Sequence, residues 1–383
     1  MHTRTLILLF AVHATIAARE AQAQSPLPGA RVRLDLVRGP LITSSRIMGL
    51  GGAFVGVGEG IDGIYRNPAA LSNRNERSRS WFDIDLTFDW LLVSSAQIDW
   101  DGDTRPLSAD FAFQAVNLGL VMQFGPLGLG ILATLYGWEG PAFSVANADQ
   151  LLGLGWAFAD GEVIVGAGVM VATLAIRTTS LTTPADSELN GAGVDVGFLW
   201  RPRDADWRLG ARLRTTTHLA QGDAADPAVS ELVGISPWQL ALGWSSYYSA
   251  DPTRHYNPRL RSKVPKPSDR RYLLISSELV LIGTSDAQSL ESLVAATPRP
   301  SGRHLSVAVH LGAEGEVMHD RLRARVGTYL EPVRVAGRQD LRLHITGGVE
   351  LHLFEFLFDW KANFAFDLAP GWENVTLGVG FWK

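Results

Sequence analysis

The sequence contains no cysteine. This absence excludes disulfide bonds, cysteine-ligated zinc, a thiol nucleophile and a lipid-bearing cysteine at a processed N-terminus. Charged residues are also scarce, because they make up 19% of the chain against roughly 25% in typical soluble domains. The formal net charge is -5, whereas nucleic-acid binding usually needs a basic domain or stripe. We therefore expect no nucleic acid among the partners of this protein.

Long apolar runs are missing as well. Beyond the N-terminus no stretch of 18 apolar residues occurs, so the sequence predicts no membrane-spanning helix. Yet hydrophobic residues make up 46% of the chain and glycine contributes 39 residues. Intrinsic disorder requires low hydrophobicity and high charge, and is therefore disfavoured.

The first residues have the features of a secretory signal peptide. Arg4 precedes a short apolar run from Leu6 to Val12, and Ala21-Gln22-Ala23 has the form of a cleavage site. We expect residues 1–23 to be removed on export.

From about residue 81 onward the hydrophobic pattern has a period of two, which is typical of β-strands. Between Leu341 and Phe354, apolar residues alternate with Arg342, His344, Glu350 and His352. A soluble sandwich shows such alternation with its polar face in water, and a membrane barrel shows it with the polar face in the lumen. Short and long connections largely alternate along the chain, and aromatic residues lie near the predicted strand ends, as in membrane barrels.

We therefore predict an all-β fold, a transmembrane antiparallel β-barrel of about fourteen strands in residues 81–383. An even number of strands leaves both barrel ends on the periplasmic side of a Gram-negative outer membrane. One connection is unusual: residues 250–270 are long, basic and proline-rich, yet fall on the side of the short turns. Either this is a periplasmic insert or a pair of strands is miscounted nearby. The strands are expected near 81–100, 111–124, 127–138, 149–159, 162–177, 190–200, 206–219, 237–249, 271–283, 303–316, 320–330, 341–354, 358–368 and 372–382.

Residues 24–80 precede the barrel and contain a glycine-rich stretch, residues 44–72. Its glycines, among them Gly49, Gly51 and Gly52, lack the spacing and partners of a phosphate-binding loop. Its apolar residues need burial, which argues against a free linker. Asn67-Pro68 is a turn signal, and Pro68 before Ala69 suits the first turn of a short helix. We predict a compact plug that folds inside the barrel.

The stretch from Arg46 to Phe54 (R-I-M-G-L-G-G-A-F), followed by I-Y-R-N-P-A-A-L up to Leu71, resembles the N-terminal region of FadL/TodX-type outer-membrane transporters of hydrophobic compounds. The resemblance implies a fourteen-stranded barrel with an N-terminal hatch that includes Asn67, Pro68 and Ala69. Two features depart from the family: Arg66 stands where an aromatic residue is often found, and the chain ends on Lys383 rather than an aromatic residue.

The resemblance implies passive uptake of hydrophobic small molecules, such as fatty acids or aromatic hydrocarbons, with outer-membrane lipid around the barrel. The alternative is a barrel that acts as a scaffold or receptor for secreted or surface proteins, because related secretion-system barrels share a similar N-terminal motif. Protein partners stay unknown, and the motif implies no cofactor.

The alternating pattern also predicts which charges line the lumen. One interpretation is that these side chains contact the head group of a solute, and the other is that they pair with one another, as charges in barrel interiors usually do. Histidine pairs on one strand lie too far apart to chelate one metal ion. Catalytic motifs are missing, so we expect neither a metal site nor an enzyme. The possible ligand contacts are Arg321, Arg323, Arg325, Arg342, His344 and Glu350.

Overall fold

The computed structural model describes residues 32–73, 81–93, 98–104, 112–139, 143–178, 185–203, 205–221, 232–249, 256–257, 271–291, 299–319, 321–336 and 341–382. The predicted signal peptide lies outside the described residues. No helix in the described part of the chain is long and apolar enough to cross a membrane.

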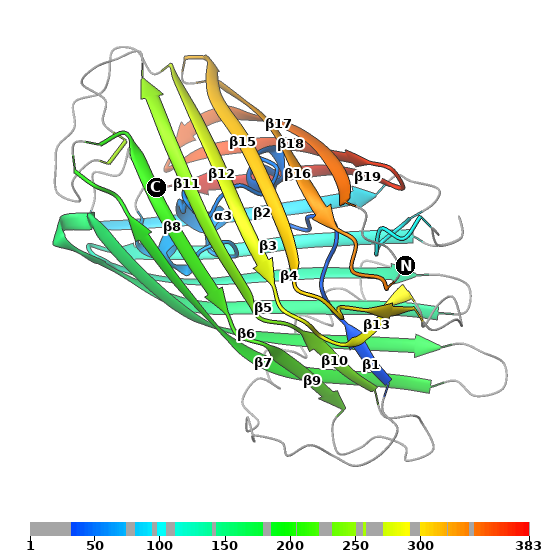
Figure 1. Ribbon diagram of the computed structural model, residues 1–383. Coiled ribbons are helices and arrows are strands. Elements are labelled where there is room, and N and C mark those ends of the chain that lie inside the picture. The colour runs from blue at the N-terminus through cyan, green and yellow to red at the C-terminus, as the bar shows by residue number, and fades with distance from the viewer. Residues whose placement is uncertain are drawn as a thin grey trace.

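Fourteen long strands form a closed antiparallel barrel (Figure 1). Each pairs with its neighbours along the chain, and β19 pairs with β2 to close the ring. The prediction of fourteen strands is confirmed. The strands are β2 (Phe82–Val93), β3 (Ala112–Phe124), β4 (Leu127–Glu139), β5 (Phe143–Phe158), β6 (Val163–Thr178), β7 (Ala185–Trp200), β8 (Trp207–Arg214), β11 (Gln239–Ser249), β12 (Tyr272–Ile282), β15 (Ser306–Met318), β16 (Leu322–Pro332), β17 (Leu341–Phe356), β18 (Phe358–Ala369) and β19 (Trp372–Trp382).

Five short strands at one end of the barrel were not predicted as separate strands, although the predicted strand over 206–219 covers the first residues of one of them. They are β1 (Val32–Asp35), β9 (Thr217–Gln221), β10 (Leu232–Ser236), β13 (Ala287–Ser289) and β14 (Pro300–Ser301). Strand β1 pairs in parallel with β10 and with β13, which ties the start of the described chain to this end. Strands of two to five residues are too short to show an alternating pattern, so most of these segments were predicted as connections.

The two ends of the barrel differ in their connections. At the end where β19 finishes, β3 and β4 are joined through Gly125 and Pro126, and β17 and β18 through Leu357. Short turns mark the periplasmic end of such barrels. Strands β11 and β12 pair directly along their lengths at this end, so no strand pair was miscounted here. Apart from Tyr256 and Asn257, residues 250–270 lie outside the described residues. We refer to the opposite end, which carries β1, β9, β10, β13 and β14, as the outer end.

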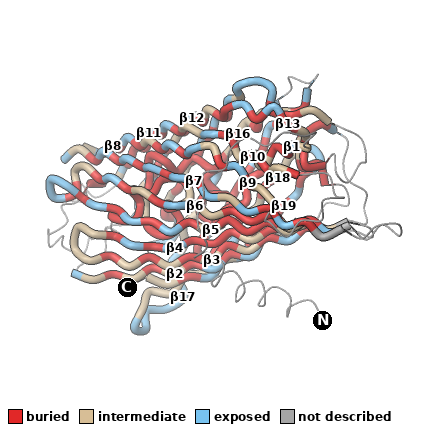
Figure 2. The backbone as a smooth tube through the Cα atoms, turned by 90° about the horizontal axis from the view of Figure 1, so that it is seen from below, coloured by how far each residue is buried: buried red, intermediate tan, exposed pale blue. Residues whose placement is uncertain are grey.

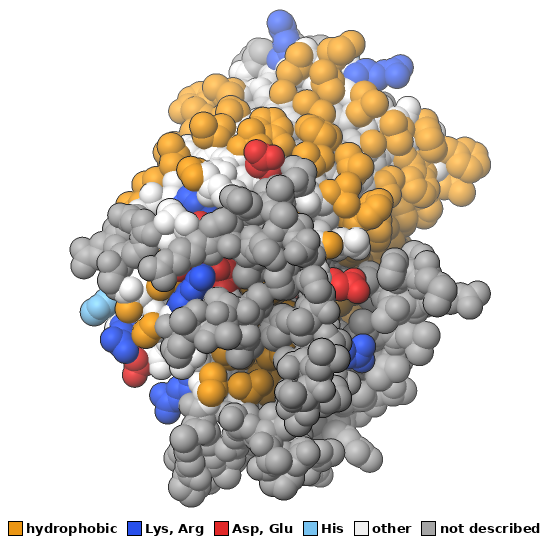
Figure 3. All heavy atoms as spheres, turned by 90° about the vertical axis from the view of Figure 1, so that its right-hand side faces the viewer, with side chains coloured by type: hydrophobic (Ala, Val, Ile, Leu, Met, Phe, Trp, Pro, Cys, Tyr) orange, Lys and Arg blue, Asp and Glu red, His pale blue; other side chains and the backbone are white. Residues whose placement is uncertain are grey.

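Buried and more exposed residues alternate along the barrel strands (Figure 2). On β17 the outward-facing Leu343 and Ile345 are 50% and 56% exposed, while the inward-facing Arg342 and His344 are buried. Hydrophobic side chains cover much of the outer wall in Figure 3. The face assignment is therefore confirmed, and the polar face lies in the lumen as in a transmembrane barrel.

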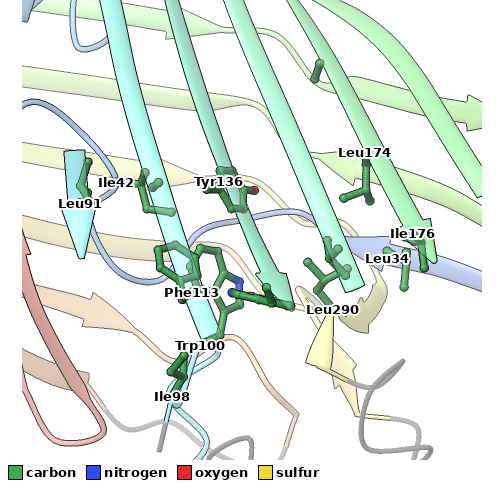
Figure 4. Close-up of a cluster of buried hydrophobic side chains, with 14 of the residues drawn as sticks. Leu34, Ile42, Leu91, Ile98, Trp100, Phe113, Tyr136, Leu174, Ile176 and Leu290 are labelled. Carbon is green, nitrogen blue, oxygen red and sulfur yellow. The ribbon is translucent and has the colours of Figure 1, made fainter. Parts of the chain in front are cut away.

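Several aromatic residues do not lie where the strand-end pattern suggested. Trp81 and Tyr248 are exposed on the outer surface. In contrast, Trp100, Trp138 and Trp372 are buried in a lumenal cluster at the outer end (Figure 4). The indole of Trp100 stacks on Tyr136 with ring centres 5.5 Å apart and meets the ring of Trp138 edge-on at 4.9 Å. Strand β2 also ends at Val93, so the predicted strand over 81–100 was too long.

The N-terminal segment, which we define as residues 36–73, folds inside the barrel. It contains helix α2 (Ser45–Gly49), the single turn α3 (Gly60–Gly63) and the 3₁₀-helix η1 (Pro68–Ser72). Helix α2 contacts β16, β17, β18 and β19, while η1 contacts β3 to β7 on the opposite side. Nearly all of its side chains from Leu41 onward are buried. Residues 44–72 therefore fill the lumen rather than link two parts of the chain.

Candidate functional site: the lumen and its N-terminal segment

Asn67 caps η1 and fixes the N-terminal segment to the wall. Its side-chain oxygen accepts a hydrogen bond from the backbone N–H of Ala69 at 3.0 Å, and Pro68 occupies the first helical position. Its side-chain amide donates to the carbonyl of Val55 at 2.9 Å and to that of Phe198, on β7, at 3.0 Å. The predicted turn is present, and Asn67 forms hydrogen bonds both within the N-terminal segment and with the barrel wall.

The glycines singled out in the sequence lie where the segment touches the opposite wall. Gly51 and Gly52 have positive φ values of 60° and 83°, which side-chain-bearing residues rarely adopt. The carbonyl of Gly51 lies 2.7 Å from Nδ1 of His310. A β-carbon at Gly51 would also come within 2.6 Å of the backbone N of Thr328. Gly49 ends helix α2 against Arg325.

Ion pairs connect the segment to strands around the ring. Arg46 donates two hydrogen bonds of 3.1 Å to Glu314 on β15, and Arg208 on β8 pairs with Glu59 at 2.6 Å. Lys361 on β18 lies 3.6 Å from Asp62. All but Glu59 are nearly buried, and removing one partner of a buried pair leaves an uncompensated charge. The segment is therefore held on several sides at once.

Strand β12 holds one turn of the segment, Ala53 to Val55, by hydrogen bonds to its backbone. The hydroxyl of Ser276 donates to the carbonyl of Ala53 at 2.7 Å. One carboxylate oxygen of Glu278 accepts the N–H groups of Phe54 and Val55, both at 2.9 Å. The other oxygen of Glu278 accepts from Arg66.

The lumen contains two cavities with different lining residues, which we call the outer cavity and the inner cavity. The outer cavity has a volume of about 130 Å³ and is roofed by residues 35–43 of the chain. Much of its lining is apolar or aromatic. Those side chains include Tyr65, Trp100, Tyr136, Met170, Leu219, Val280, Ile282 and Tyr329.

Charges in the outer cavity gather around Tyr65. The guanidinium groups of Arg214, Arg38 and Arg212 lie 4.7, 5.6 and 5.8 Å from the centre of its ring. Arg212 and Arg214 are both paired with the buried Asp195, at 2.8 and 2.7 Å, and Arg38 is paired with Asp149. The cavity therefore offers apolar contact beside many polar and charged groups, which also include Asp35, Glu331 and Arg334.

The inner cavity lies between the Ala53–Val55 turn and the periplasmic end and has a volume of about 60 Å³. Its walls carry a row of stacked tyrosines, in which Tyr247 lies 5.0 Å from Tyr256 and 5.1 Å from Tyr272 between ring centres. Tyr256 belongs to the insert after β11, and its hydroxyl lies 2.8 Å from that of Ser245. Most of the other lining residues are charged: Arg46, Glu59, Arg208, Glu314, Arg323, Glu350, His352, Asp359 and Lys361.

Most of the lumenal charges that were predicted as ligand contacts form ion pairs or hydrogen bonds with other buried side chains. Arg325 lies 2.6 Å from Glu314 and 2.5 Å from Glu350, and Arg342 makes a bidentate pair with Glu331. The carboxylates of Asp367 and Glu331 flank the imidazole of His344, each at 2.8 Å.

Of the six residues predicted as ligand contacts, Arg323 and Glu350 line a cavity. Arg321 is exposed at the turn before β16 and does not line the lumen, because the strand begins only at Leu322. Its assignment to the lumenal face was wrong. The alternating pattern was extended by one residue into the turn.

Glu278 and Ser276 were missed by the sequence reasoning. Both lie on the inward face of β12, and the alternation Leu274, Ser276, Glu278, Val280 gave the only available signal. A single acidic residue in an otherwise apolar strand marks a group that needs a buried partner. The sequence does not say that the partner is a turn more than 200 residues earlier.

Four carboxylates, which we call the acidic cluster, meet at the outer end: Asp99, Asp101, Asp103 and Glu291. Each offers an oxygen within 4.8 Å of the others, a donor set that suits a hard cation. The guanidinium of Arg299 already lies 2.8 Å from Glu291 and 3.3 Å from Asp103. Burial raises the pKa of Glu291 to about 9, and the neighbouring Asp101 adds to this rise.

Comparison with known proteins was made at the levels of sequence and structure. No protein-family model and no curated protein matches the sequence. Solved structures do match. The TodX deltaS2S3 mutant, a monoaromatic hydrocarbon channel, superposes with a TM-score of 0.58 at 14% identity, covering 91% of this chain and 99% of its own.

Two further structures give the same result. The CymD monoaromatic hydrocarbon channel has a TM-score of 0.55 at 13% identity, covering 88% of this chain and 95% of its own. A Pseudomonas aeruginosa FadL homologue has a TM-score of 0.54 at 11% identity, covering 89% and 97%. The fold is that of these channels. The closed barrel with an apolar outer face is accordingly an outer-membrane barrel.

Proposed function

We propose that this protein takes up small hydrophobic molecules across the outer membrane, and that the outer cavity binds them. The outer cavity carries the proposal, because it is lumenal, about half of its lining residues are apolar or aromatic, and it is bounded by the N-terminal segment. The neighbours in fold are channels, two of them described as monoaromatic hydrocarbon channels. No catalytic group is required for such passive transport.

The volume of the outer cavity favours a solute with a single ring. Its 130 Å³ is close to the roughly 150 Å³ of an engineered apolar protein cavity that binds benzene. A long acyl chain would not fit without movement of residues 35–43. The buried hydroxyls of Tyr65 and Tyr136 and the paired arginines also suit a ring with one polar substituent.

In this proposal the N-terminal segment is the hatch, within a domain of residues 24–80 that precedes the barrel domain of 81–383. Asn67, Pro68 and Ala69 anchor the hatch to the wall, and Gly49, Gly51 and Gly52 allow its close approach to β15 and β16. The two cavities are separate, so in this proposal passage from one to the other requires the hatch to move.

The test is uptake of a labelled single-ring hydrocarbon by cells that carry the protein in the outer membrane. Ala308 faces the outer cavity, and Val309, its neighbour on β15, is 37% exposed on the lipid side. Replacing Ala308 with Phe fills the cavity and should lower the initial rate at least fivefold, about 1 kcal/mol. The matched Val309→Phe variant should transport like the parent. Equal rates for both variants and the parent would contradict the proposal.

A second candidate function is a scaffold or receptor for other proteins. The tightly packed lumen favours it, because a structural barrel needs no passage. Under this alternative the parent shows no uptake above that of cells without the protein, and the Ala308→Phe variant retains every partner that co-purifies with the parent.

A further inference from the structure

One hairpin at the periplasmic end extends past its neighbour in the ring. Strand β17 pairs with β16 as far as Leu351, which lies opposite Leu322. Beyond that point Phe354 and Phe356 pair with β18 alone among the described strands. We define residues 353–358 as the hairpin tip. Figure 2 shows this tip, beside the label β17, standing out from the outline of the barrel.

The hairpin tip exposes large apolar side chains. Phe354, Phe356 and Leu357 are 58%, 70% and 75% exposed. Two other turns at the same end carry small or polar residues instead: Gly125 joins β3 to β4, and Asp160 lies between β5 and β6. Exposed apolar groups that lie together on a surface indicate contact with something other than water.

The backbone of the turn supports the same conclusion. Leu357 has a φ of 58°, which bulky side chains rarely adopt, whereas glycine and asparagine adopt it at lower cost. Asp160 has almost the same φ, 60°, but a polar side chain. In water both the backbone and the side chain would favour a small or polar residue at position 357. Leucine is favourable there only in apolar surroundings.

The apolar surface of the hairpin tip is continuous with the lipid-facing wall. Phe354 lies opposite Trp360 on β18, and Trp360 lies opposite Phe381 on β19. The ring centres are 6.1 Å apart in the first pair and 5.2 Å apart in the second. The next outward-facing row towards the middle of the wall is also apolar: Met318, Leu322, Leu351, Ala362 and Val379.

The opposite face of the hairpin tip is acidic. Glu355 lies opposite Asp359 in the ladder between β17 and β18. A carboxylate oxygen of Asp359 lies 3.4 Å from Nδ1 of His352, which lines the inner cavity. The tip therefore has an aromatic face that points away from the barrel and a carboxylate face that points towards the periplasmic opening.

The length of β17 places the hairpin tip at the level of the lipid head groups. From Val349, in the middle of β17, to Leu357 the chain advances about 26 Å at roughly 3.3 Å per residue. A strand tilt of about 40° reduces this to about 20 Å along the membrane normal. The hydrocarbon core ends about 15 Å from its midplane. The tip thus lies just beyond the hydrocarbon, where aromatic side chains are common.

We propose that the hairpin tip is an interfacial anchor. Phe354, Phe356 and Leu357 insert among the phospholipids of the periplasmic leaflet, while Glu355 and Asp359 stay in water. The partner is the lipid surface, because the aromatic face of the tip continues the face of the wall that contacts lipid. This contact fixes the depth of the barrel on the side of β17 and does not depend on what the lumen carries.

The experiment uses the absence of cysteine, because one introduced cysteine then carries a dye at one position. Leu357→Cys is compared with Asp160→Cys, the turn residue with a matched φ, and with Leu351→Cys on the outer wall. Each variant is labelled with nitrobenzoxadiazole and refolded into phosphatidylcholine vesicles. At position 357 we expect quenching by nitroxide-labelled lipid close to that at position 351. Iodide on both sides of the vesicles should quench it at least threefold less than at position 160.

Two results of this experiment would overturn the anchor. Quenching by iodide at position 357 that equals quenching at position 160 would place the hairpin tip in water. Shielding from both iodide and nitroxide lipid would show that protein, such as a second copy of this chain, covers the tip instead of lipid.

A second measurement needs no dye. Leu357→Asn relieves the backbone, because asparagine adopts a positive φ more readily, but it removes the apolar side chain. A tip in water would become more stable, and an anchored tip becomes less stable. We expect the urea midpoint of unfolding from phosphatidylcholine vesicles to fall for Leu357→Asn and to stay unchanged for the matched Asp160→Asn. A midpoint for Leu357→Asn at or above that of the parent would contradict the anchor.

Discussion

The side-chain amide of Asn67 donates a hydrogen bond of 3.0 Å to the carbonyl of Phe198, a residue 131 positions later in the chain. The same asparagine caps η1 and bonds the carbonyl of Val55. One buried side chain thus joins two parts of the N-terminal segment to the barrel wall. The barrel strands have their own ladder, so this side chain matters for docking of the segment rather than for closure of the ring.

Replacing Asn67 with Leu should therefore loosen the segment without preventing barrel assembly. The change leaves buried backbone groups without partners, at a cost of roughly 1–3 kcal/mol for each. We expect a lower unfolding temperature in detergent, with the amount of protein in the outer membrane close to that of the parent. Asn190→Leu is the control, since Asn190 is exposed and bonds Glu188 and Thr173 within the wall. A variant at Asn67 that unfolds like this control would show that the cap does not hold the segment.

Close packing at Gly128 gives a second prediction. A methyl group there would overlap the carbonyl of Leu71 in η1, so Gly128→Ala should cost roughly 1–3 kcal/mol through overpacking. At Gly315 a β-carbon would meet only the carbonyl of Tyr272, at 3.2 Å, so Gly315→Ala should be nearly neutral. The midpoint of thermal unfolding, followed by gel mobility, measures both. Equal midpoints would mean that η1 is not seated on β4.

The cost of placing a charge at different depths in the membrane can be measured on one strand, β17. Val349 lies in the middle of β17 and Leu341 at its outer end, and both side chains face outward. Val349→Arg should lower the free energy of unfolding by about 2–4 kcal/mol, and Leu341→Arg by only about 0–1 kcal/mol. The cost of a charged side chain falls from the middle of the membrane towards the interface. Refolding into lipid vesicles measures this difference. A cost that does not depend on depth would contradict the assignment of this face to lipid.

The acidic cluster predicts a pH dependence at the outer end. Burial raises the pKa of Glu291 to about 9 and that of Asp101 to about 6, against ordinary values near 4.5 and 3.8. Raised carboxyl pKa values mean that folding favours the protonated forms. The stability they contribute is complete below about pH 4 and is lost as pH rises towards 9.

Glu291→Gln should remove the larger part of this dependence. Its amide oxygen can still accept the N–H of Trp100, which bonds Glu291 at 2.6 Å in the parent. We expect the parent to lose thermal stability between pH 5 and pH 9 and the variant to lose much less. Parallel pH profiles would show that Glu291 does not titrate in this range.

The barrel itself could be predicted from the sequence because the alternation of apolar and polar residues recurs in its fourteen strands. Along β17, every residue from Leu341 to Thr346 shows the predicted face. The turn at Asn67-Pro68 was also predictable, because asparagine and proline impose local geometry. Both features are determined by residues that lie close together in the sequence.

The contacts that shape the site could not be predicted in this way. Glu278 meets the Phe54 backbone across 224 residues, and β1 pairs with β10 across about 200. These contacts depend on how the closed barrel brings distant segments together, and the local sequence pattern does not determine them. The aromatic residues show the same limit. Trp81 lies directly before β2 and Trp372 begins β19, yet Trp81 is exposed and Trp372 is buried in the lumen.

The most direct measurement of the central claim is a crystal structure of the protein soaked with bromobenzene, using the anomalous signal of bromine. The account predicts a bromine peak in the outer cavity, beside Tyr136, Met170 and Leu219, and loss of this peak in the Ala308→Phe variant. Bromine found only on the lipid-facing wall, with the same pattern in parent and variant, would contradict the assignment of the outer cavity as the binding site.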